Sequence, residues 1–507
     1  MVPRISQNTV VAVVGAGAMG AGIAQVAAAA GHTVRLLDNR EGAAAQAIAG
    51  IRAQFDKLAA KGKWSSQAAQ EAGARLIAVQ RATELADASL VVEAIVENLQ
   101  VKQQLFRDLE AVVSAECILA TNTSSISITA MGAALQRPQR LAGLHFFNPA
   151  PLMALVEVVS GLATDAQVAD TLFATATAWG KTPVHARSTP GFIVNRVARP
   201  YYAEALRLLT EGGADCATLD ACCREAGGFR MGPFELMDMI GHDVNFAVTR
   251  SVWNAYFNDP RFLPSLVQQE LVEAGYLGKK NGRGFYRYAD GAERPAPQTE
   301  AAQALPNDIV IYGHSPAATA LAERLSAKNL AFKQAPAQGE ALASAGGATL
   351  MVTDGRTATR RASEQQTPNV VLVDLALDYR LATRLAVSVA AQCDDAASRS
   401  ATGLLQAAGY AVSILRDIAG LIVMRTVAML ANEAADAVNQ GVCDVLGVDT
   451  AMRLGVNYPR GPLAWANAVG MDRISTVLTH LAQTYGEDRY RTSPLIQHHV
   501  YSGKAFS

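Results

Sequence analysis

The sequence lacks the features that mark several special classes of protein. No apolar run free of charged residues reaches about 18 residues, so we expect no transmembrane helix. Lys and Arg total 44 against 45 Asp and Glu, a net charge of −1, which argues against a protein that binds nucleic acid or a membrane surface. No secretory signal is expected, because the first residues lead directly into an apolar strand and a glycine loop.

Cysteine is also scarce, and its arrangement argues against a disulfide framework. The six cysteines include no CxxC pair and no spacing typical of disulfides. We therefore expect reduced thiols in a cytoplasmic protein, and we predict no bound metal. The cysteines are Cys117, Cys216, Cys222, Cys223, Cys393 and Cys443.

Apolar residues are abundant enough for several cores. The 507 residues are 50% hydrophobic and 18% charged, which predicts a folded chain of roughly three or four domains. In the first part of the chain, short apolar strands alternate with helices, the pattern of βαβ units and a parallel sheet. The predicted strands are Val10–Val14, Val34–Leu37, Leu76–Val79, Leu90–Val92 and Ile118–Ala120, with helices over Gly17–Ala30, about 42–61 and about 99–114.

From Pro190 the pattern changes to long helices without strands. Residues 293–308 are rich in Pro, Ala and polar residues, which is typical of a linker. A second strand–helix stretch follows over about 308–400, and the last hundred residues are helical again. The strands predicted in this second stretch are Ile309–Tyr312, Leu350–Val352 and Val370–Val373.

The helical part of the chain is duplicated. PGFIVNRVARPYYAEA begins at Pro190 and AGLIVMRTVAMLANEA begins at Ala419. We call the shift that carries Pro190 onto Ala419 the repeat offset. The alignment runs without a gap from Pro190 to Asp243 and pairs Gly232-Pro233 with Gly461-Pro462. Self-similarity at a fixed offset indicates two copies of one helical domain, whereas the strand–helix parts correspond only loosely.

A glycine loop follows the first strand. VVAVVGAGAMGAGIA carries Gly15-x-Gly17-x-x-Gly20 between a strand and a helix, and the next strand ends in Asp38. Gly15 permits a tight turn, Gly17 lets the backbone approach a pyrophosphate at the helix N-terminus, and Gly20 allows the helix to pack closely. Asp38 can accept hydrogen bonds from both ribose hydroxyls and repels a 2′-phosphate, which favours NAD over NADP, although Arg40 is close in sequence. The alternative is a tight turn without a ligand.

The second strand–helix part has GHSPAA where the first has GAGAMG, and no acidic residue ends the equivalent strand. We therefore predict that it binds no dinucleotide. The expected fold is an α/β Rossmann-type NAD-binding domain plus an all-α domain, followed by a degenerate Rossmann-like domain and a second copy of the all-α domain. The predicted ranges are 1–187, 188–292, 293–307 for the linker, 308–400 and 401–507.

His145 and Glu157 lie in the segment LHFFNPAPLMALVEVV. An enzyme that oxidises an alcohol with NAD needs a base for the hydroxyl proton, and histidine suits that task near neutral pH. If the chain turns at residues 148–151, the strand with Glu157 runs back beside His145. A carboxylate in so apolar a strand is costly unless it is paired, and Glu157 can fix the tautomer of His145 and stabilise its cation. A lone histidine at a strand end is more commonly structural.

Several motifs together resemble the 3-hydroxyacyl-CoA dehydrogenase family over about residues 8–288. They are GAGAMG, TNTSSISI, LHFFNPAPLMALVEVV, TPGFIVNR, GPFELMD and GKKNGRGFY. With its duplicated helical domain, the chain looks like the long bacterial form, which is associated with phenylacetate catabolism and oxidises 3-hydroxyadipyl-CoA. The resemblance implies an NAD-dependent enzyme that converts an (S)-3-hydroxyacyl-CoA into a 3-oxoacyl-CoA.

The resemblance also implies roles for individual residues. His145 matches the catalytic base, and Glu157 matches its orienting carboxylate. Ser124, in TNTSS, matches the serine that hydrogen-bonds the substrate oxygen. Asn195, in GFIVNR, matches the asparagine that completes the site.

Further residues match the family's cofactor and coenzyme A contacts. Lys61 falls where the family places a lysine near the coenzyme A phosphates, but the serine that accompanies it in some relatives is Gln54 here. The implied cofactor contacts are Glu97, Lys102, Asn122, Asn148 and Lys280, with Ala18 and Met19 of the glycine loop.

Simpler explanations exist for some of these residues. Ser124 could cap the helix that follows it, and Lys61 could belong to a solvated helix face with neighbouring lysines. Asn195 is harder to explain structurally, because Met424 takes its place in the repeat and the helix there packs without an amide.

Three functions remain open on the sequence. The first is oxidation of 3-hydroxyadipyl-CoA, with Arg199 or Arg230 as a candidate for binding the terminal carboxylate. The second is oxidation of 3-hydroxybutyryl-CoA in another pathway. The third is a non-enzymatic NAD-binding structural protein, which the complete set of site residues argues against.

The duplication predicts how the helical domains pack. Short members of the family dimerise through this domain, so we expect residues 188–288 and 409–507 to form a pseudo-twofold pair inside one chain. We expect one active site per chain, in a monomer or a homodimer. The second half lacks the histidine–glutamate pair, the glycine loop and the asparagine.

Overall fold

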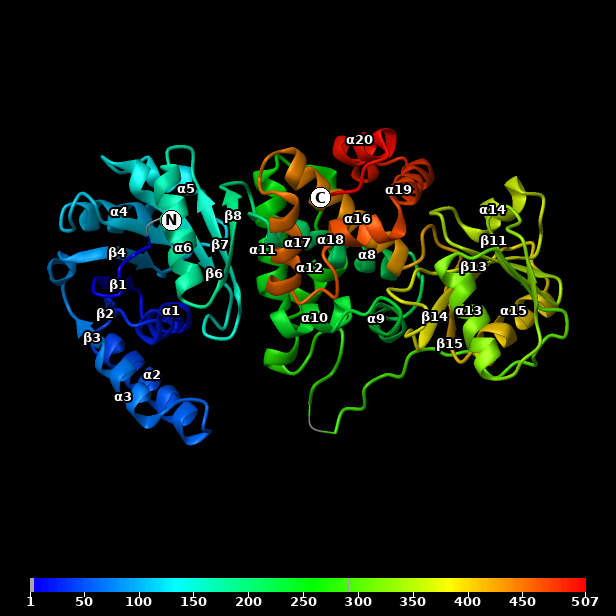
Figure 1. Cartoon of the computed structure of the whole chain (residues 1–507), viewed down its shortest axis with the longest axis horizontal. Coiled ribbons are helices and arrows are strands. Elements are labelled where there is room, and N and C mark those ends of the chain that lie inside the picture. The colour runs from blue at the N-terminus through cyan, green and yellow to red at the C-terminus, as the bar shows by residue number, and fades with distance from the viewer. Residues whose placement is uncertain (1–3, 290) are drawn as a thin grey trace. The chain divides into compact units, whose positions relative to one another are not determined.

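The computed structural model describes residues 4–289 and 291–507, which form two compact units (Figure 1). Unit 1 holds the chain up to Arg196 together with Gln440–Val456. Unit 2 holds Val197–Asn439 together with Asn457–Ser507.

Unit 1 is built on an eight-stranded sheet of order β3-β2-β1-β4-β5-β6-β7-β8. Neighbouring strands are parallel except β6 and β7, which are antiparallel. The order reverses at β1 and β4, as in a doubly wound fold that binds its ligand at the carboxyl ends of these strands. The strands are β1 (Val10–Val14), β2 (Thr33–Leu37), β3 (Leu76–Val79), β4 (Ala88–Glu93), β5 (Ile118–Thr121), β6 (Leu141–Phe146), β7 (Leu155–Ser160) and β8 (Thr182–Arg187).

Helices cover this sheet, and α2 and α3 pack together and project beyond it (Figure 1). The amphipathic helix α2 buries Ile48, Ile51 and Phe55, which recur at helical spacing. The helices of unit 1 are α1 (Ala18–Ala29), α2 (Ala43–Ala60), α3 (Ser66–Ala74), α4 (Leu99–Glu110), α5 (Ile128–Gly132), α6 (Ala166–Ala178) and α17 (Val445–Gly455), with α7 (Val194–Val197) at its end and short 3₁₀ turns at Ala82–Leu85 and Pro138–Arg140.

Unit 2 contains a seven-stranded sheet of order β10-β9-β11-β12-β13-β14-β15. It differs from the first sheet at β11, which is antiparallel to both β9 and β12. The degenerate Rossmann-like domain that the sequence predicts is therefore present in a reduced form. Its strands are β9 (Val310–Tyr312), β10 (Lys333–Ala335), β11 (Ala341–Ala345), β12 (Ala348–Val352), β13 (Val370–Val373), β14 (Arg384–Val389) and β15 (Ala411–Ile414).

The other regular elements of unit 2 are helices, and residues 291–309 form neither helix nor strand. The helices are α8 (Arg199–Thr210), α9 (Cys216–Glu225), α10 (Pro233–Ile240), α11 (His242–Ala255), α12 (Leu266–Glu273), α13 (Pro316–Ala327), α14 (Ala358–Glu364), α15 (Asp395–Ala407), α16 (Val423–Asn439), α18 (Pro462–Val469), α19 (Met471–Tyr485) and α20 (Pro494–Ser502), with 3₁₀ turns at Pro260–Phe262, Lys279–Asn281 and Asp488–Tyr490.

The repeat extends further than the sequence suggests. The repeat offset relates β7 to β14 and α6 to α15 at both ends, and it relates the first residues of β6 and β8 to those of β13 and β15. The strand–helix parts were expected to correspond only loosely, and for the second half of the sheet this is wrong. The side chains there have changed while the backbone elements have kept their places. At this offset Asp374 takes the place of His145, and Ala386 takes the place of Glu157.

One helix of each helical copy packs against the sheet of the other copy. In unit 1, α17 packs on β7 and β8, and Arg187 N donates a hydrogen bond to Val442 O at 2.8 Å. In unit 2, α9 packs on β14, and Arg416 N donates to Gly213 O at 3.0 Å. The two contacts are counterparts at the repeat offset, so the exchange is reciprocal.

The two helical copies also contact one another inside unit 2. Helices α8 and α16 pack together, and Arg425 Nε of α16 donates to Glu204 Oε2 of α8 at 2.6 Å. Both side chains are at most 1% exposed, so the interface is closed to water. A buried charge of one sign needs the other nearby, so this ion pair makes the two copies depend on each other.

The described residues contain no helix long and apolar enough to cross a lipid bilayer. All six cysteines are free thiols.

Candidate active site

His145 and Glu157 face each other across the antiparallel strands β6 and β7. The imidazole Nδ1 lies 2.6 Å from Glu157 Oε2, and the two residues are 6% and 0% exposed. The predicted pairing around the proline-containing turn is confirmed. With Nδ1–H donated to the carboxylate, Nε2 is the ring nitrogen that can accept a proton from a substrate.

The second oxygen of Glu157 anchors the start of α7. Glu157 Oε1 accepts hydrogen bonds from Ile193 N and Val194 N, both at 3.0 Å. The turn before them places Phe192 at φ 48°, and its ring lies 5.9 Å from the His145 ring. Asn195, which is half-buried, is the next residue after this anchor. One carboxylate thus fixes both the imidazole and the segment that carries the asparagine.

Ser124 lies in the loop after β5, where Glu97 organises the backbone. Glu97 Oε1 accepts from Thr123 Oγ1 at 2.6 Å, from Ser124 N at 3.1 Å and from Ser125 Oγ at 3.0 Å. The following helix α5 is capped by Ser127, whose side chain accepts from Ala130 N. The alternative that Ser124 caps this helix is therefore wrong.

Lys102 lies beneath Glu97 rather than on the surface. Its Nζ contacts Glu93 Oε1 at 2.6 Å and Glu97 Oε2 at 3.1 Å, and its side chain is 1% exposed against 39% for Glu97. Burial alone raises the pKa of Glu97, but the hydrogen bond from Thr123 and the charge of Lys102 outweigh it and lower that pKa. Glu97 is therefore an exposed anion that forms an ion pair with the buried cation of Lys102.

Glu93 is a residue that our sequence reasoning missed. It ends β4, is 0% exposed, and accepts hydrogen bonds from Lys102 and from Thr121 Oγ1, the latter at 2.6 Å. The signal was present in the sequence, because LVVE places a carboxylate at the end of an apolar run just as LVEVV does for Glu157.

The fold requires two of the three glycines of the loop, and the third leaves room for a ligand. Gly15 has φ 106°, and a Cβ there would lie 2.4 Å from Ala94 O. A Cβ on Gly20 would lie 1.8 Å from Gly15 O, so this glycine permits the close approach of α1. Gly17 has open space where its Cβ would point and forms the N-cap of α1. An open helix N-terminus of this kind fits a pyrophosphate.

Asp38 follows β2 beside the glycine loop. Its Oδ2 accepts from Ala16 N at 2.7 Å, and its Oδ1 accepts from Arg40 N at 2.9 Å and Arg40 Nε at 3.0 Å. The hydrogen bond from Arg40 lowers the pKa of Asp38 to about 2, so the carboxylate is ionised at neutral pH. Arg40 itself is 69% exposed. The loop and this carboxylate together fit a dinucleotide with a free 2′-hydroxyl.

The other residues that the sequence predicts as ligand contacts are divided between unit 1 and unit 2. Asn122 Oδ1 accepts from Phe146 N at 2.9 Å, which ties the end of β5 to the end of β6. Ala18 is exposed and Met19 half-buried at the start of α1, while Lys61 is exposed at the end of α2. Lys280 lies in unit 2, where it pairs with Asp243.

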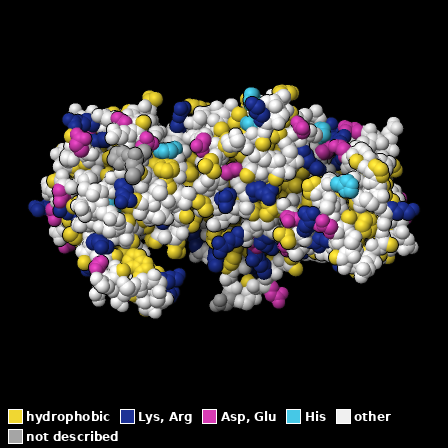
Figure 2. All heavy atoms as spheres, in the orientation of Figure 1, with side chains coloured by type: hydrophobic (Ala, Val, Ile, Leu, Met, Phe, Trp, Pro, Cys, Tyr) yellow, Lys and Arg dark blue, Asp and Glu magenta, His cyan; other side chains and the backbone are white. Residues whose placement is uncertain are grey.

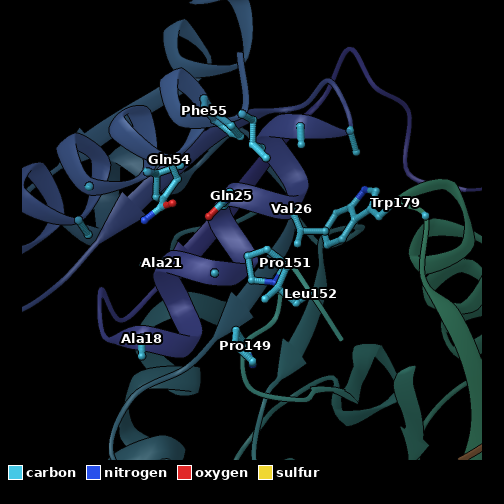
Figure 3. Close-up of a pocket in the computed structure, with 18 of the residues that line it drawn as sticks. Ala18, Ala21, Gln25, Val26, Gln54, Phe55, Pro149, Pro151, Leu152 and Trp179 are labelled. Atoms are coloured by element: carbon cyan, nitrogen blue, oxygen red, sulfur yellow. The ribbon is translucent and has the colours of Figure 1, made fainter. Parts of the chain in front are cut away.

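A cavity of about 1090 Å³ opens beside the glycine loop in unit 1 (Figure 3). It runs along α1 and α2 and is mostly apolar, with Phe55 on α2 and Trp179 among its walls. The side chains of Gln25 and Gln54 point towards one another across it (Figure 3). Asn148 also lines this cavity. Figure 2 shows hydrophobic side chains gathered beside α1 and α2, at the lower left of the view.

Comparison with known proteins assigns segments from both halves of the chain to described domain families. Residues 10–189 match the family described as "3-hydroxyacyl-CoA dehydrogenase, NAD binding domain", and residues 191–288 and 420–505 match "3-hydroxyacyl-CoA dehydrogenase, C-terminal domain". Residues 350–418 match "3-hydroxybutyryl-CoA dehydrogenase reduced Rossmann-fold domain". A protein of Escherichia coli K12 named 3-hydroxyadipyl-CoA dehydrogenase is 46% identical over 487 residues, 96% of each chain. The chain belongs to the 3-hydroxyacyl-CoA dehydrogenase family.

Other members of the family agree in sequence and fold. The mitochondrial hydroxyacyl-coenzyme A dehydrogenase of Sus scrofa is 43% identical over 55% of this chain and 90% of its own length. The crystal structure of a 3-hydroxybutyryl-CoA dehydrogenase from Escherichia coli K12 superposes with a TM-score of 0.89 and 45% identity, over 98% of this chain and 99% of that one. As a member of this family, the chain is an NAD-dependent oxidoreductase that converts a 3-hydroxyacyl-CoA into a 3-oxoacyl-CoA.

Proposed function

We propose that this enzyme oxidises 3-hydroxyadipyl-CoA, in phenylacetate catabolism, with His145 as its catalytic base. The chemical part of the proposal rests on the 2.6 Å contact between His145 and Glu157 in a buried, apolar setting. The substrate rests on the similarity to the Escherichia coli protein of that name over almost the whole chain.

In this proposal His145 Nε2 takes the proton of the 3-hydroxyl group, because Nδ1 is engaged by Glu157. Glu157 stabilises the imidazolium that results and holds the ring in orientation. When bound, NAD supplies the acceptor for the hydride that leaves C3 of the substrate. Ser124 and Asn195 donate hydrogen bonds to the substrate oxygen, and the fixed loop and helix start that carry them reduce the cost of orienting it.

Several residues suit the two ligands in this scheme. The Gly15–Gly20 loop and Asp38 would hold the pyrophosphate and the adenine ribose, and Glu97 presents an anion at the same edge of the sheet. We further propose that the coenzyme A moiety occupies the cavity along α1 and α2, with Lys61 near its phosphates. Asn148 and Lys280 remain predicted cofactor contacts.

The alternative substrate is 3-hydroxybutyryl-CoA, because the similar crystal structure from Escherichia coli is that of a protein named 3-hydroxybutyryl-CoA dehydrogenase. The two are separated by measuring NADH formation by the purified full-length chain on both thioesters. We expect a higher kcat/KM for 3-hydroxyadipyl-CoA. A preference for the shorter substrate favours the alternative, and turnover of neither thioester would contradict both substrates.

The role of His145 has its own test. His145→Ala should lower kcat by about 10²–10⁴-fold, the usual contribution of a positioned general base, while NAD affinity stays unchanged. Initial rates of NADH formation and titration of NAD by protein fluorescence give the two values. Turnover that persists at the wild-type rate would show that another group is the base.

Two broader properties belong to the same proposal. We propose one active site per chain, in a monomer or a homodimer, since the second copy has Asp374 and Ala386 where the first has the histidine–glutamate pair. A cytoplasmic location is supported by six free thiols, which persist in reducing compartments.

A further inference from the structure

Unit 2 contains a cavity of about 270 Å³ at one edge of its sheet, and the proposed chemistry does not use it. It is lined by Val352, which ends β12, by Ser315 at the start of α13, and by the turn that follows β13. Strands β9, β12 and β13 run in the same direction, so these positions share the carboxyl edge of the sheet. Open α/β sheets bind their ligands at this edge.

In the second copy, this cavity takes the place of the turn beside the catalytic histidine of the first. At the repeat offset its lining residues Leu375–Arg380 correspond to Phe146–Pro151, the turn that follows His145. Helices α18 and α19, which complete the lining, correspond to α10 and α11. The second copy lacks the catalytic pair and the glycine loop, but it has a cavity at this position.

Three arginines line the cavity, and uncharged residues take their places in the first copy. The pairs at the repeat offset are Arg380 with Pro151, Arg460 with Met231 and Arg473 with Val244. The fold that the two copies share therefore does not require these arginines. Several guanidinium groups around one small space favour an anion, whose oxygens accept hydrogen bonds from their N–H groups.

Arg460 and Arg473 are half-buried cations without an acidic partner. Arg473 Nη2 donates to Thr353 O at 3.4 Å, which places its guanidinium at the carboxyl end of β12. Within residues 4–289 and 291–507, neither arginine forms an ion pair, and Arg460 forms no hydrogen bond either. Each has lost part of its water without gaining a counter-charge, so an anion in the cavity would stabilise both.

The other charges of the cavity already have partners. Arg380 pairs with Glu323 at 2.6 Å, and both side chains are about half exposed. Among the described residues, Asp378 is the only acidic residue of the lining, and its Oδ1 accepts from Arg380 N at 2.8 Å. Two unpaired arginines therefore line the cavity together with one carboxylate, which leaves an excess of positive charge.

The start of α13 favours a phosphate group over other anions. This helix has 12 residues, and Ser315 is its N-cap. Phosphates bind at helix N-termini beside the carboxyl ends of parallel strands, because the free amide groups and the helix dipole favour negative charge. Ser315 and Pro316 replace the open glycine of the first loop, which favours a single phosphate group over a dinucleotide.

We propose that this cavity is a second ligand site of the chain, which binds a phosphate group through Arg460 and Arg473 at the start of α13. The site is additional to the active site and does not depend on which thioester the enzyme oxidises. Inorganic phosphate and the phosphate of a nucleoside monophosphate present the same chemical group. The two sources are separated by experiment.

The test is isothermal titration calorimetry of the full-length chain, with NADH at saturation so that the glycine loop of the first copy is occupied. Inorganic phosphate and AMP are titrated separately. Arg460→Met and Arg473→Val install the residues of the first copy and should fold normally, which thermal unfolding checks. Each should raise Kd by about 10- to 100-fold, the contribution of hydrogen bonds to a charged group. The control Arg399→Met removes an exposed arginine of α15 outside the lining and should leave Kd unchanged.

The possible results have distinct meanings. Tighter binding of AMP than of inorganic phosphate identifies a nucleotide as the source, and equal or weaker binding of AMP identifies free phosphate. The proposal is overturned if neither ligand binds saturably, if neither arginine variant weakens binding, or if Arg399→Met weakens it equally. The rate of NADH formation without phosphate should be unchanged in Arg460→Met, and this rate in the wild type tests the proposed function separately.

Discussion

Glu157 performs two tasks with its two oxygens. Oε2 holds His145, and Oε1 anchors the start of α7. In the second copy, Asp374 accepts hydrogen bonds from the N–H groups of the three residues that correspond to the start of α7, at 2.8 to 3.0 Å. Asp374 therefore keeps the anchoring task without a histidine. In the first copy one carboxylate has both a catalytic and a structural role, whereas in the second copy the carboxylate has only the structural role.

This separation predicts different outcomes for two matched variants. Glu157→Gln should lower kcat by about 10³–10⁴-fold, because an amide that accepts from the α7 backbone presents its NH₂ group to His145 and forces the wrong tautomer. Asp374→Asn should lower the free energy of unfolding and leave kcat unchanged. Steady-state kinetics and urea unfolding give the four values. Equal losses of kcat in both variants contradict a catalytic role for Glu157.

Asp38 predicts the choice of cofactor. Because the hydrogen bond from Arg40 holds its pKa at about 2, the carboxylate is ionised throughout the neutral and mildly acidic range and loses its charge only as the pH falls towards that value. Asp38→Asn removes the charge that repels a 2′-phosphate. The ratio of kcat/KM for NAD to that for NADP should fall by about 10- to 100-fold. An unchanged ratio would assign the discrimination to another residue.

At the scale of elements, α17 supports the strand that carries Glu157. A Cβ on Gly455 would lie 2.8 Å from Leu155 Cδ2 and 3.0 Å from Val194 Cγ2. Leu155 begins β7, and Val194 begins α7 and donates to Glu157. The absence of a side chain at Gly455 lets a helix from the second copy lie directly against the site of the first.

Gly455→Val should therefore disturb the site, although this glycine lies in the second copy and far along the chain from β7. Overpacking of this kind costs about 1–3 kcal/mol, and the shift of β7 should also lower kcat. The matched control is Leu446→Ala, which removes a 75% exposed side chain from the same helix. Urea unfolding and initial rates test both. Wild-type stability and activity in Gly455→Val would mean that α17 does not support the site.

At the scale of the whole molecule, neither half of the chain is complete alone. Unit 1 includes α17 from the second copy, and the sheet of unit 2 is covered by α9 from the first. Glu204 accepts from both Arg425 and Tyr490 Oη, which belong to the second copy. The exchange makes the two copies depend on each other for both packing and charge.

We consequently expect that a fragment of residues 1–290 does not form a stable, active monomer. It loses α17 and both partners of Glu204, and breaking a buried ion pair costs about 3–5 kcal/mol. We expect a fragment that aggregates or self-associates and has little activity. Light scattering and NADH formation, compared with the full chain, test this. A monodisperse and fully active monomer contradicts the prediction.

Much of the site was accessible from the sequence because local rules govern it. A glycine loop between a strand and a helix, with an acid at the next strand end, restricts both backbone and ligand. His145 and Glu157 are joined by a short turn, so their pairing follows from one antiparallel register. The surroundings of Ser124 and Lys102 were harder to predict. Which serine caps α5, and whether Lys102 faces solvent or lies beneath Glu97, depend on packing that a motif does not describe.

The sequence by itself determined the element types, the repeat and the family, because periodicity, glycine spacing and motifs are local properties of the chain. Only the tertiary structure decided that α17 and α9 each pack against the sheet of the other copy. It also decided that Asp374 keeps the backbone-anchoring role of Glu157, and that Arg460 and Arg473 line a cavity of the second copy. An apolar helix face shows that a helix must be covered. It does not show which surface covers it, since that choice depends on the whole set of competing contacts.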